Sequence, residues 1–508
     1  MRKNVIKMSS FVVYIIIMAL WNVILFCGSS YGISVILFML PLMILLYYYF
    51  KKNNLIKNKS GLLFMIPILL ISFSYLVFNN TLLYSLNFPV IIVLMLLMYI
   101  YTIKPTYKLS ELFGNMGSLL FEPIGYIGKF GTEVKNVFNK KSGLSEQSRK
   151  NIKSILIIIP IVLVVLALLM HADLIFNDLF KGIVDFFKNI KIFDNLISKI
   201  ITFVFIFFAI GSSLLFISER FMSTPREESK LFKSDANTIK LLIIVLDIIY
   251  VVFDYIQINS LILHSVSSSI DYATYARQGF FELLAVSIIN ITIILLSKKF
   301  KVKDKKENNI INISSIIMII LTSIIIVSSF LRMNLYEAAY GYTMLRLLVY
   351  ISLITESILL IPTIIYILNP KFNIVKYYLT IVICVYTMIN YCNLDYIIAK
   401  RNIDRYYNST MKIVDKNFNY YNPHDSYSYR LYKYTNLDLN YLMNNKTDNI
   451  SLLVDLYNRT TDPYMINALN MYFKEIEEEN DYTWEEFNIS KYNALKELEE
   501  LQKRNPQI

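Results

Sequence analysis

The stretch DYATYARQGFFEL, residues 271–283, lies between two long apolar segments and decides how the chain is arranged. It places Arg277 and Glu282 beside an aromatic run, at the point where the chain turns back into a second apolar segment. Apolar runs near 20 residues long recur along the sequence, and this is the length that crosses roughly 30 Å of hydrocarbon. The pattern predicts an all-α, polytopic integral membrane protein.

The composition favours the same class. Of the 508 residues, 56% are hydrophobic and 17% are charged, and the mean hydropathy is +0.48. Soluble domains carry about 25% charged residues. The formal net charge is +12, but residues 393–508 hold 14 Lys and Arg against 18 Asp and Glu. The basic excess therefore lies in the loops between apolar runs, where the positive-inside rule explains it, and no nucleic-acid partner is expected.

Eleven membrane spans are predicted. With a cytoplasmic amino terminus, every lysine cluster falls inside, after spans two, four, six and eight. The first run has no small-residue cleavage site after it, which favours an uncleaved span over a signal peptide. The predicted spans are 11–26, 33–50, 62–78, 88–103, 155–170, 200–217, 239–258, 279–296, 310–330, 341–361 and 374–391.

These spans divide the chain into four parts. Residues 1–103 form a four-span region, and 104–152 form a basic cytoplasmic loop whose glycines argue against one long helix. Residues 153–392 form a seven-span core, with an amphipathic interfacial helix at 172–199. Residues 393–508 are expected to form a small α-helical domain outside the inner (plasma) membrane.

Charged residues inside the spans are the candidate working part. A charge at the centre of a span costs roughly 2.5–3.5 kcal/mol on insertion scales, so it pairs, lines a cavity or has a function. The topology places Asp247 and Glu356 deepest and the others near the outer boundary. The cluster consists of Asp247, Asp254, Arg277, Glu282, Arg332, Glu337, Arg346 and Glu356. Either it is an ion-pair network that holds the helices together, or it lines an outward-facing cavity for a polar ligand, an ion or a lipid headgroup.

Two short patterns within the cluster are informative. Asp247 and Asp254 are seven residues apart and so share a helix face. Arg277 and Glu282 have the same spacing as Arg332 and Glu337, which suggests two related helical hairpins.

No catalytic or metal-binding motif is present. The histidines His171, His264 and His424 lack ligand spacing, and three cysteines cannot form a disulfide framework. Zinc-protease and phosphate-loop patterns are missing from the sequence. A nucleophile elbow, whose serine follows a strand, is not expected in a chain of apolar helices. We therefore expect no metal and no cofactor, and no residue can be assigned a catalytic role.

Five motifs in the second half of the chain form a recognisable series. They are YARQGFFEL (275–283), RMNLYEAAYGYTMLR (332–346), NLDYIIAKRNIDRY (393–406), DLNYL (438–442) and WEEFNISKYNAL (484–495). In this order they resemble a bacterial multi-span family catalogued as domain of unknown function 4173, with its relative 4153. The likeness covers roughly residues 150–508, and a Tyr/Asn-rich insertion near 407–428 departs from it. The resemblance implies a bacterial membrane protein with a tail domain and no established activity.

Three functions remain open. The first is sensing, scaffolding or binding at the cell envelope through the charged cluster and the tail, with membrane lipids and either another envelope protein or a polar ligand as partners. The second is transport of protons or a cation by the buried acids. The third is a lipid- or glycan-modifying enzyme built on the outer carboxylates.

Overall fold

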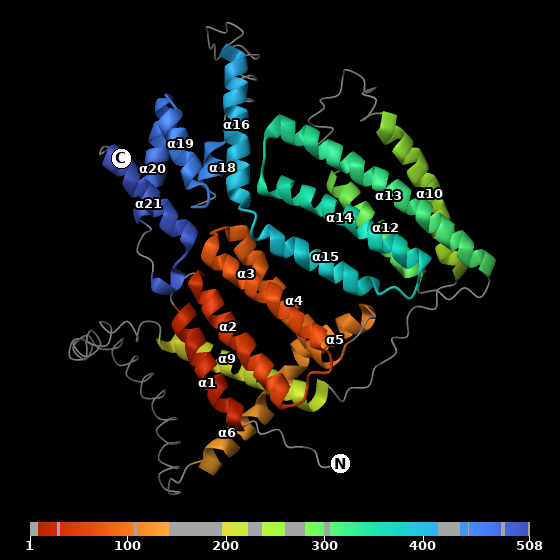
Figure 1. Ribbon diagram of the computed structural model, residues 1–508, viewed down its shortest axis with the longest axis vertical. Helices are drawn as coiled ribbons and strands as arrows, with labels where there is room; N and C mark the ends of the chain where they lie inside the picture. Colours follow the sequence, from red (N-terminus) through yellow and green to blue (C-terminus); the bar gives the residue numbers. More distant parts are fainter. Residues whose placement is uncertain are drawn as a thin grey trace, which may run out of the picture.

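The computed structural model describes residues 9–27, 31–105, 109–141, 196–221, 236–259, 280–298, 305–414, 437–444, 447–478 and 483–505. All secondary structure in these ranges is helical (Figure 1). Six helices are long and apolar enough to cross a membrane, and a seventh span results if Ile374–Ile389 and Leu394–Asn408, which meet at a 61° bend, count as one. The chain is thus an all-helical protein with several apolar spans.

The sequence predicts eleven spans, which is more than the six or seven that the described helices provide. Predicted span five, 155–170, and most of the interfacial helix 172–199 lie outside the described residues. Predicted spans one and eight correspond to shorter apolar helices, Phe11–Phe26 and Phe281–Ser297. Predicted span seven is helical but carries two acids, Asp247 and Asp254, within its length.

A first bundle is built from the amino-terminal helices and one later helix, with several short elements at one end (Figure 1). Its members pack in the order α9, α1, α2, α3 and α4 around one apolar core. Its long helices are α1 (Ser9–Phe26), α2 (Ile33–Lys52), α3 (Met65–Val77), α4 (Thr81–Ile103) and α9 (Leu196–Phe216). The short elements are η1 (Lys59–Phe64), α5 (Leu109–Phe121), η2 (Glu122–Tyr126), α6 (Ile127–Lys141) and η3 (Ile217–Phe221).

A second bundle surrounds a separate apolar core. Its helices are α10 (Ala236–Gln257), α12 (Phe280–Ser297), α13 (Lys305–Tyr340) and α14 (Met344–Leu368). The long helix α13 packs against the other three. Between the two bundles lies α15 (Ile374–Ile389), which contacts α14 on one side and α3 on the other (Figure 1).

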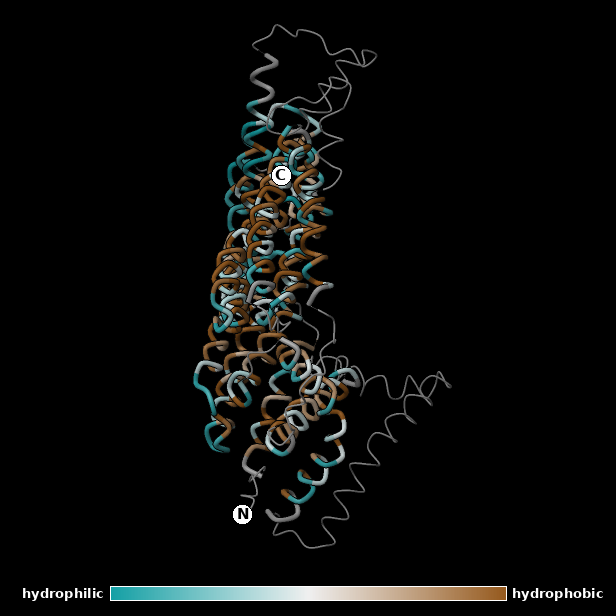
Figure 2. Tube along the Cα trace, turned by 90° about the vertical axis from the view of Figure 1, so that its right-hand side faces the viewer, coloured by the Kyte–Doolittle hydropathy of each residue, from teal (hydrophilic) through white to brown (hydrophobic). Residues whose placement is uncertain are grey.

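The tail forms a third helical group with its own apolar core. Its elements are α16 (Leu394–Val414), α18 (Leu439–Met443), α19 (Ile450–Arg459), α20 (Pro463–Glu478), η5 (Trp484–Glu486) and α21 (Ile489–Arg504). The long bundle helices are mostly apolar along their length, whereas α16 is more polar (Figure 2).

The tail touches the bundles at one end only among the described residues. It meets the start of α2, where Ile33 donates to the Phe487 carbonyl at 2.9 Å, and the turns before α4 and α14. At the opposite ends of the helices lie Lys51 and Lys52, in the last turn of α2, and Lys104, directly after α4. We call these the tail-contact end and the lysine end.

Candidate polar ligand site

The first part of the predicted cluster is a polar stripe on α10 that faces α13. Ser314 donates to Oδ2 of Asp247 at 2.6 Å, and Asp247 is 7% exposed. Nearer the tail-contact end, Oε1 of Gln257 accepts from Arg332 at 2.9 Å. Asp254 lies between them and is 2% exposed, and neither of its carboxylate oxygens has a hydrogen-bond partner in the described part of the chain. Arg332 thus bonds to the amide of Gln257.

Glu356 belongs to a different contact within the same bundle. The Ser287 hydroxyl donates to its Oε2 atom, and its Oε1 atom has no hydrogen-bond partner in the described ranges. A second polar link lies beside it, because Asn290 accepts from Tyr250 at 2.8 Å and donates to Thr322 at 3.0 Å. These bonds tie α10, α12, α13 and α14 together.

Glu337 and Arg346 lie together at the turn between α13 and α14. Glu337 is 8% exposed, with the Tyr342 and Tyr350 hydroxyl groups close to its carboxylate. The Arg346 guanidinium lies 4.2 Å from the centre of the Tyr336 ring and donates to the Gly341 carbonyl. This part of the cluster does face the tail-contact end.

The structure does not gather the eight residues into one ring. Glu282 is exposed on the first turn of α12, and Arg277 lies outside the described residues. Whether the eight residues act together stays a prediction.

Two further arginines, which sequence reasoning did not include, complete the Glu337 region. Arg401 and Arg405 are four residues apart on α16 and so share a helix face. Arg405 donates to the Ala338 carbonyl at 2.8 Å. Burial and the neighbouring Arg346 guanidinium lower the pKa of Arg405 below its usual value. The spacing of the two arginines inside the motif at 393–406 was a signal that could have found them.

These groups surround a cavity of about 520 Å³, which we call the arginine pocket. Its lining residues are Glu337, Ala338, Tyr342, Arg401, Asp404, Arg405 and Asn408. The pocket thus combines two guanidinium groups and two carboxylates. Such a set can bind an anionic group and an adjacent cationic group at the same time.

The backbone beside the arginine pocket is held in place by α16. The Asn402 side chain accepts from the Tyr342 N–H at 2.8 Å and donates to the Tyr342 carbonyl at 2.9 Å. Gly341 has φ +80°, a conformation that glycine adopts at little cost. A Cβ atom at this position would lie 2.7 Å from Oδ1 of Asn402.

A second polar region joins the tail to the first bundle. The Asn79 N–H donates to both carboxylate oxygens of Asp448, at 2.9 and 3.0 Å, and the Asn80 amide donates to Asp395 at 2.5 Å. Asn488 is fully buried, and its amide donates to two carbonyls of the α3–α4 connection. The sequence indicated only a polar turn here, because asparagines in a turn do not show which distant segment they bond.

The described residues contain no group of three or more His, Cys, Asp or Glu side chains that could hold a metal ion.

Comparison with known proteins identifies a family but no characterised relative. No curated protein and no solved structure matches the chain. A family model described as a domain of unknown function, number 4153, matches residues 65–454, which includes the second bundle, the arginine pocket, part of the tail and the first bundle from α3 onward, but not α1 or α2. This is the relative of the family 4173 whose motifs the chain resembles, and the match starts earlier than those motifs do. With most of its length matched, the chain belongs to the family of the domain of unknown function 4153.

Proposed function

We propose that this chain is a bacterial plasma-membrane protein of eleven spans, with its amino terminus in the cytoplasm and its tail outside. The support is the separation of the two ends. Among the described residues the tail meets helix ends and turns that the positive-inside rule predicts to be outside, and Lys51, Lys52 and Lys104 lie at the opposite end. Labelling of a cysteine at an exposed tail position, Tyr464→Cys, by a membrane-impermeant reagent on intact cells tests this. Labelling only after lysis would contradict it.

Its function in this proposal is to bind a lipid headgroup at the outer membrane surface through the arginine pocket. The observation that carries the proposal is the pairing of Arg401 and Arg405 with the buried acid Glu337 around one cavity of about 520 Å³. Guanidinium groups bind phosphate through two parallel hydrogen bonds, and a carboxylate beside them favours a neighbouring ammonium. A zwitterionic phosphate headgroup has both charges in this arrangement.

Substitution of Arg401 tests the headgroup proposal. Arg401 is exposed, and Arg401→Gln removes one guanidinium without disturbing the bond from Arg405 to the backbone. The neighbouring Lys400 is also exposed but does not line the pocket, so Lys400→Gln is the matched control. Native mass spectrometry of the full chain from bilayers containing phosphatidylethanolamine should show about tenfold less retained lipid for the first variant only. Equal retention by both variants would refute the proposal.

A second candidate is proton-coupled transport, favoured by the buried acids of the second bundle. Asp254 has no hydrogen-bond partner at either oxygen within the described ranges, and Asp247 and Glu356 each have one such oxygen. Unpaired acids inside a span are typical of proton pathways. A pH-driven flux in proteoliposomes that Asp254→Asn abolishes would favour transport, whereas an Asp254→Asn protein that retains its lipid and shows no change in flux would remove this candidate.

A further inference from the structure

A second cavity lies inside the first bundle, well away from the arginine pocket. It has a volume of about 690 Å³ and is lined by residues of α1, α2, α3, α4, α5, η2 and α9. The helices of this bundle pack in sequence from α9 through α1, α2 and α3 to α4, but no extensive contact joins α4 to α9. The cavity therefore lies at the seam where the ring of helices is open.

Apolar side chains at the seam are exposed on the outer surface of the bundle. Phe88 of α4 and Phe205 of α9 both line the cavity, and they are 64% and 69% exposed. Leu120 lines it from α5 and is 46% exposed. In a bilayer, these side chains would face hydrocarbon, so the cavity opens sideways toward the lipid.

The lining extends along the helices. On α2 it runs from Val35, near the tail-contact end, to Leu46, and on α4 from Phe88 to Tyr99, one turn from the lysine end. Each of these stretches spans about 17 Å at the rise of an α-helix, and together they cover more of the depth than either one alone. Half of a hydrocarbon core about 30 Å thick is about 15 Å, so the cavity is long enough for the hydrocarbon chain of one leaflet. Its volume falls in the range of small-molecule sites.

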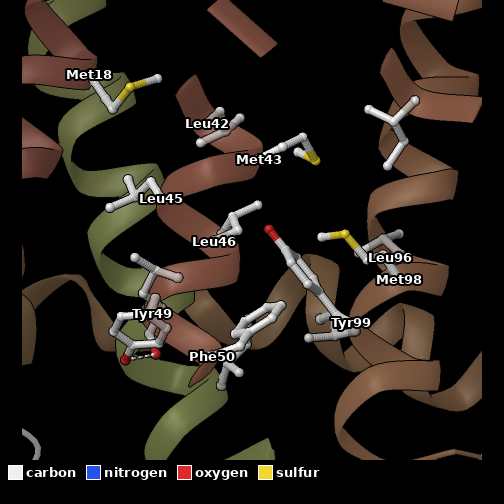
Figure 3. Packing of buried hydrophobic residues seen from close by; sticks show 14 of the residues in the cluster. Met18, Leu42, Met43, Leu45, Leu46, Tyr49, Phe50, Leu96, Met98 and Tyr99 are labelled. Atoms are coloured by element: carbon white, nitrogen blue, oxygen red, sulfur yellow. Dashed lines mark hydrogen bonds between the residues drawn. The ribbon is translucent and has the colours of Figure 1, made fainter. Parts of the chain in front are cut away.

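Two of the polar side chains in this mainly apolar lining are Asn22 and Tyr99. Asn22 and Tyr99 are 8% and 9% exposed, and within the described residues neither the Asn22 amide nor the Tyr99 hydroxyl has a hydrogen-bond partner. Figure 3 shows the Tyr99 hydroxyl pointing toward Leu46 across the space between α4 and α2. Neither polar group is among the fully enclosed atoms that lack a partner, so both are open to the cavity that they line. A ligand with an oxygen at the end of an apolar chain would give such a group a hydrogen-bond partner.

The position of Asn22 indicates where that oxygen lies. Asn22 is one turn before the end of α1, near the tail-contact end, and therefore at the depth where the chains of one leaflet join their headgroups. We propose that the cavity binds one hydrocarbon chain of a membrane lipid, which enters between α4 and α9 and whose ester oxygen accepts a hydrogen bond from Asn22. This site is independent of the arginine pocket, which lies on the second bundle.

Photo-crosslinking tests this proposal on the intact chain. The protein is placed in a bilayer that contains a phospholipid with a diazirine near the end of one acyl chain, irradiated and mapped by peptide mass spectrometry. Leu42 and Leu46 line the cavity and are only 6% and 2% exposed, so label on them requires a chain inside it. Ile44, which is 60% exposed, reports the outer surface of the same helix. We expect label at all three positions, and label at Ile44 alone would overturn the proposal.

Two variants of α9 sharpen the test. Ala209 lines the cavity, so Ala209→Phe should lower label on Leu42 and Leu46 about tenfold while label on Ile44 stays unchanged. Val204 lies on the same helix, is 44% exposed and does not line the cavity, so Val204→Phe is the matched control. Equal labelling of the cavity in both variants would contradict a lipid chain in this site. So would crosslinks between α2 and residues 142–195, because the chain itself would then fill the space.

Discussion

The junction between the tail and the first bundle depends on one buried side chain, Asn488. Its amide nitrogen donates to the carbonyls of Tyr75 and Phe78, each at 2.8 Å, and also lies 3.1 Å from the Tyr84 hydroxyl. Its Oδ1 atom accepts from the Lys491 N–H at 3.1 Å and so caps α21. Asn488→Ser retains a capping oxygen, because serine is a good N-cap residue, but it removes both bonds to the α3–α4 connection.

The expected loss follows from these contacts. Each hydrogen bond to a buried carbonyl contributes about 1–1.5 kcal/mol, so two lost bonds weaken docking of the tail by roughly 2–3 kcal/mol. Since about 1.4 kcal/mol is a tenfold change in an equilibrium constant, the tail should open roughly 30–100 times more often. The cap contributes little to this difference because it is retained.

Hydrogen exchange measures the opening directly. The N–H groups of Ile33 and Asn79 bond to tail residues, so peptides that contain them report docking. In Asn488→Ser, we expect both peptides to exchange roughly 30–100 times faster, with peptides of the second bundle unchanged. Asn373 caps α15 at the lysine end, and Asn373→Ser is the control for a cap substitution far from the junction. If Asn488→Ser exchanges like the control, the reasoning is refuted.

Two other predictions concern the tail-contact end. Burial and the Asp448 carboxylate raise the pKa of Asp395 from 3.8 to about 7, and burial also raises the pKa of Asp448. The docked state thus binds protons more tightly than the open state, so docking is strongest near pH 4 and weakens as pH rises to 7, by up to about 4 kcal/mol for Asp395. Hydrogen exchange of the docked peptides at pH 5 and pH 8, corrected for intrinsic rates, should show this loss, and Asp395→Asn should remove most of it. Gly341→Ala combines a positive φ with a contact to Asn402 and should destabilise the α13–α14 turn by at least about 1 kcal/mol, detected as faster exchange there; an unchanged rate would contradict this.

The long apolar helices were predictable from sequence because a helix that crosses the hydrocarbon core of a membrane needs about 20 apolar residues. Helices α2, α4 and α14 contain or closely match predicted spans 33–50, 88–103 and 341–361. The polar contacts were not predictable to the same degree. Asn79 and Asp448 are 369 positions apart, and the sequence around either residue does not indicate that the two bond to each other.

The candidate site shows the same limit. Charges in apolar runs indicated that Glu337 and Arg346 matter, since a buried charge needs neighbours. The sequence did not show that Arg332 would bond to Gln257, because an uncharged amide in a span gives no comparable signal. It also did not place α16 beside them, because the partners of a polar helix are set by tertiary packing.

Helix α16 is the element that connects the two polar regions. At its first turn Asp395 accepts from Asn80 of the first bundle, and about two turns later Asn402 bonds to both backbone groups of Tyr342 in the second bundle. A helix transmits displacement along its axis because its backbone bonds keep its residues in a fixed arrangement. If a ligand binds Arg401 in the arginine pocket, we expect the Asp395 contact to respond, because both residues belong to α16. We therefore expect occupancy of the pocket and docking of the tail on the first bundle to be coupled through this helix.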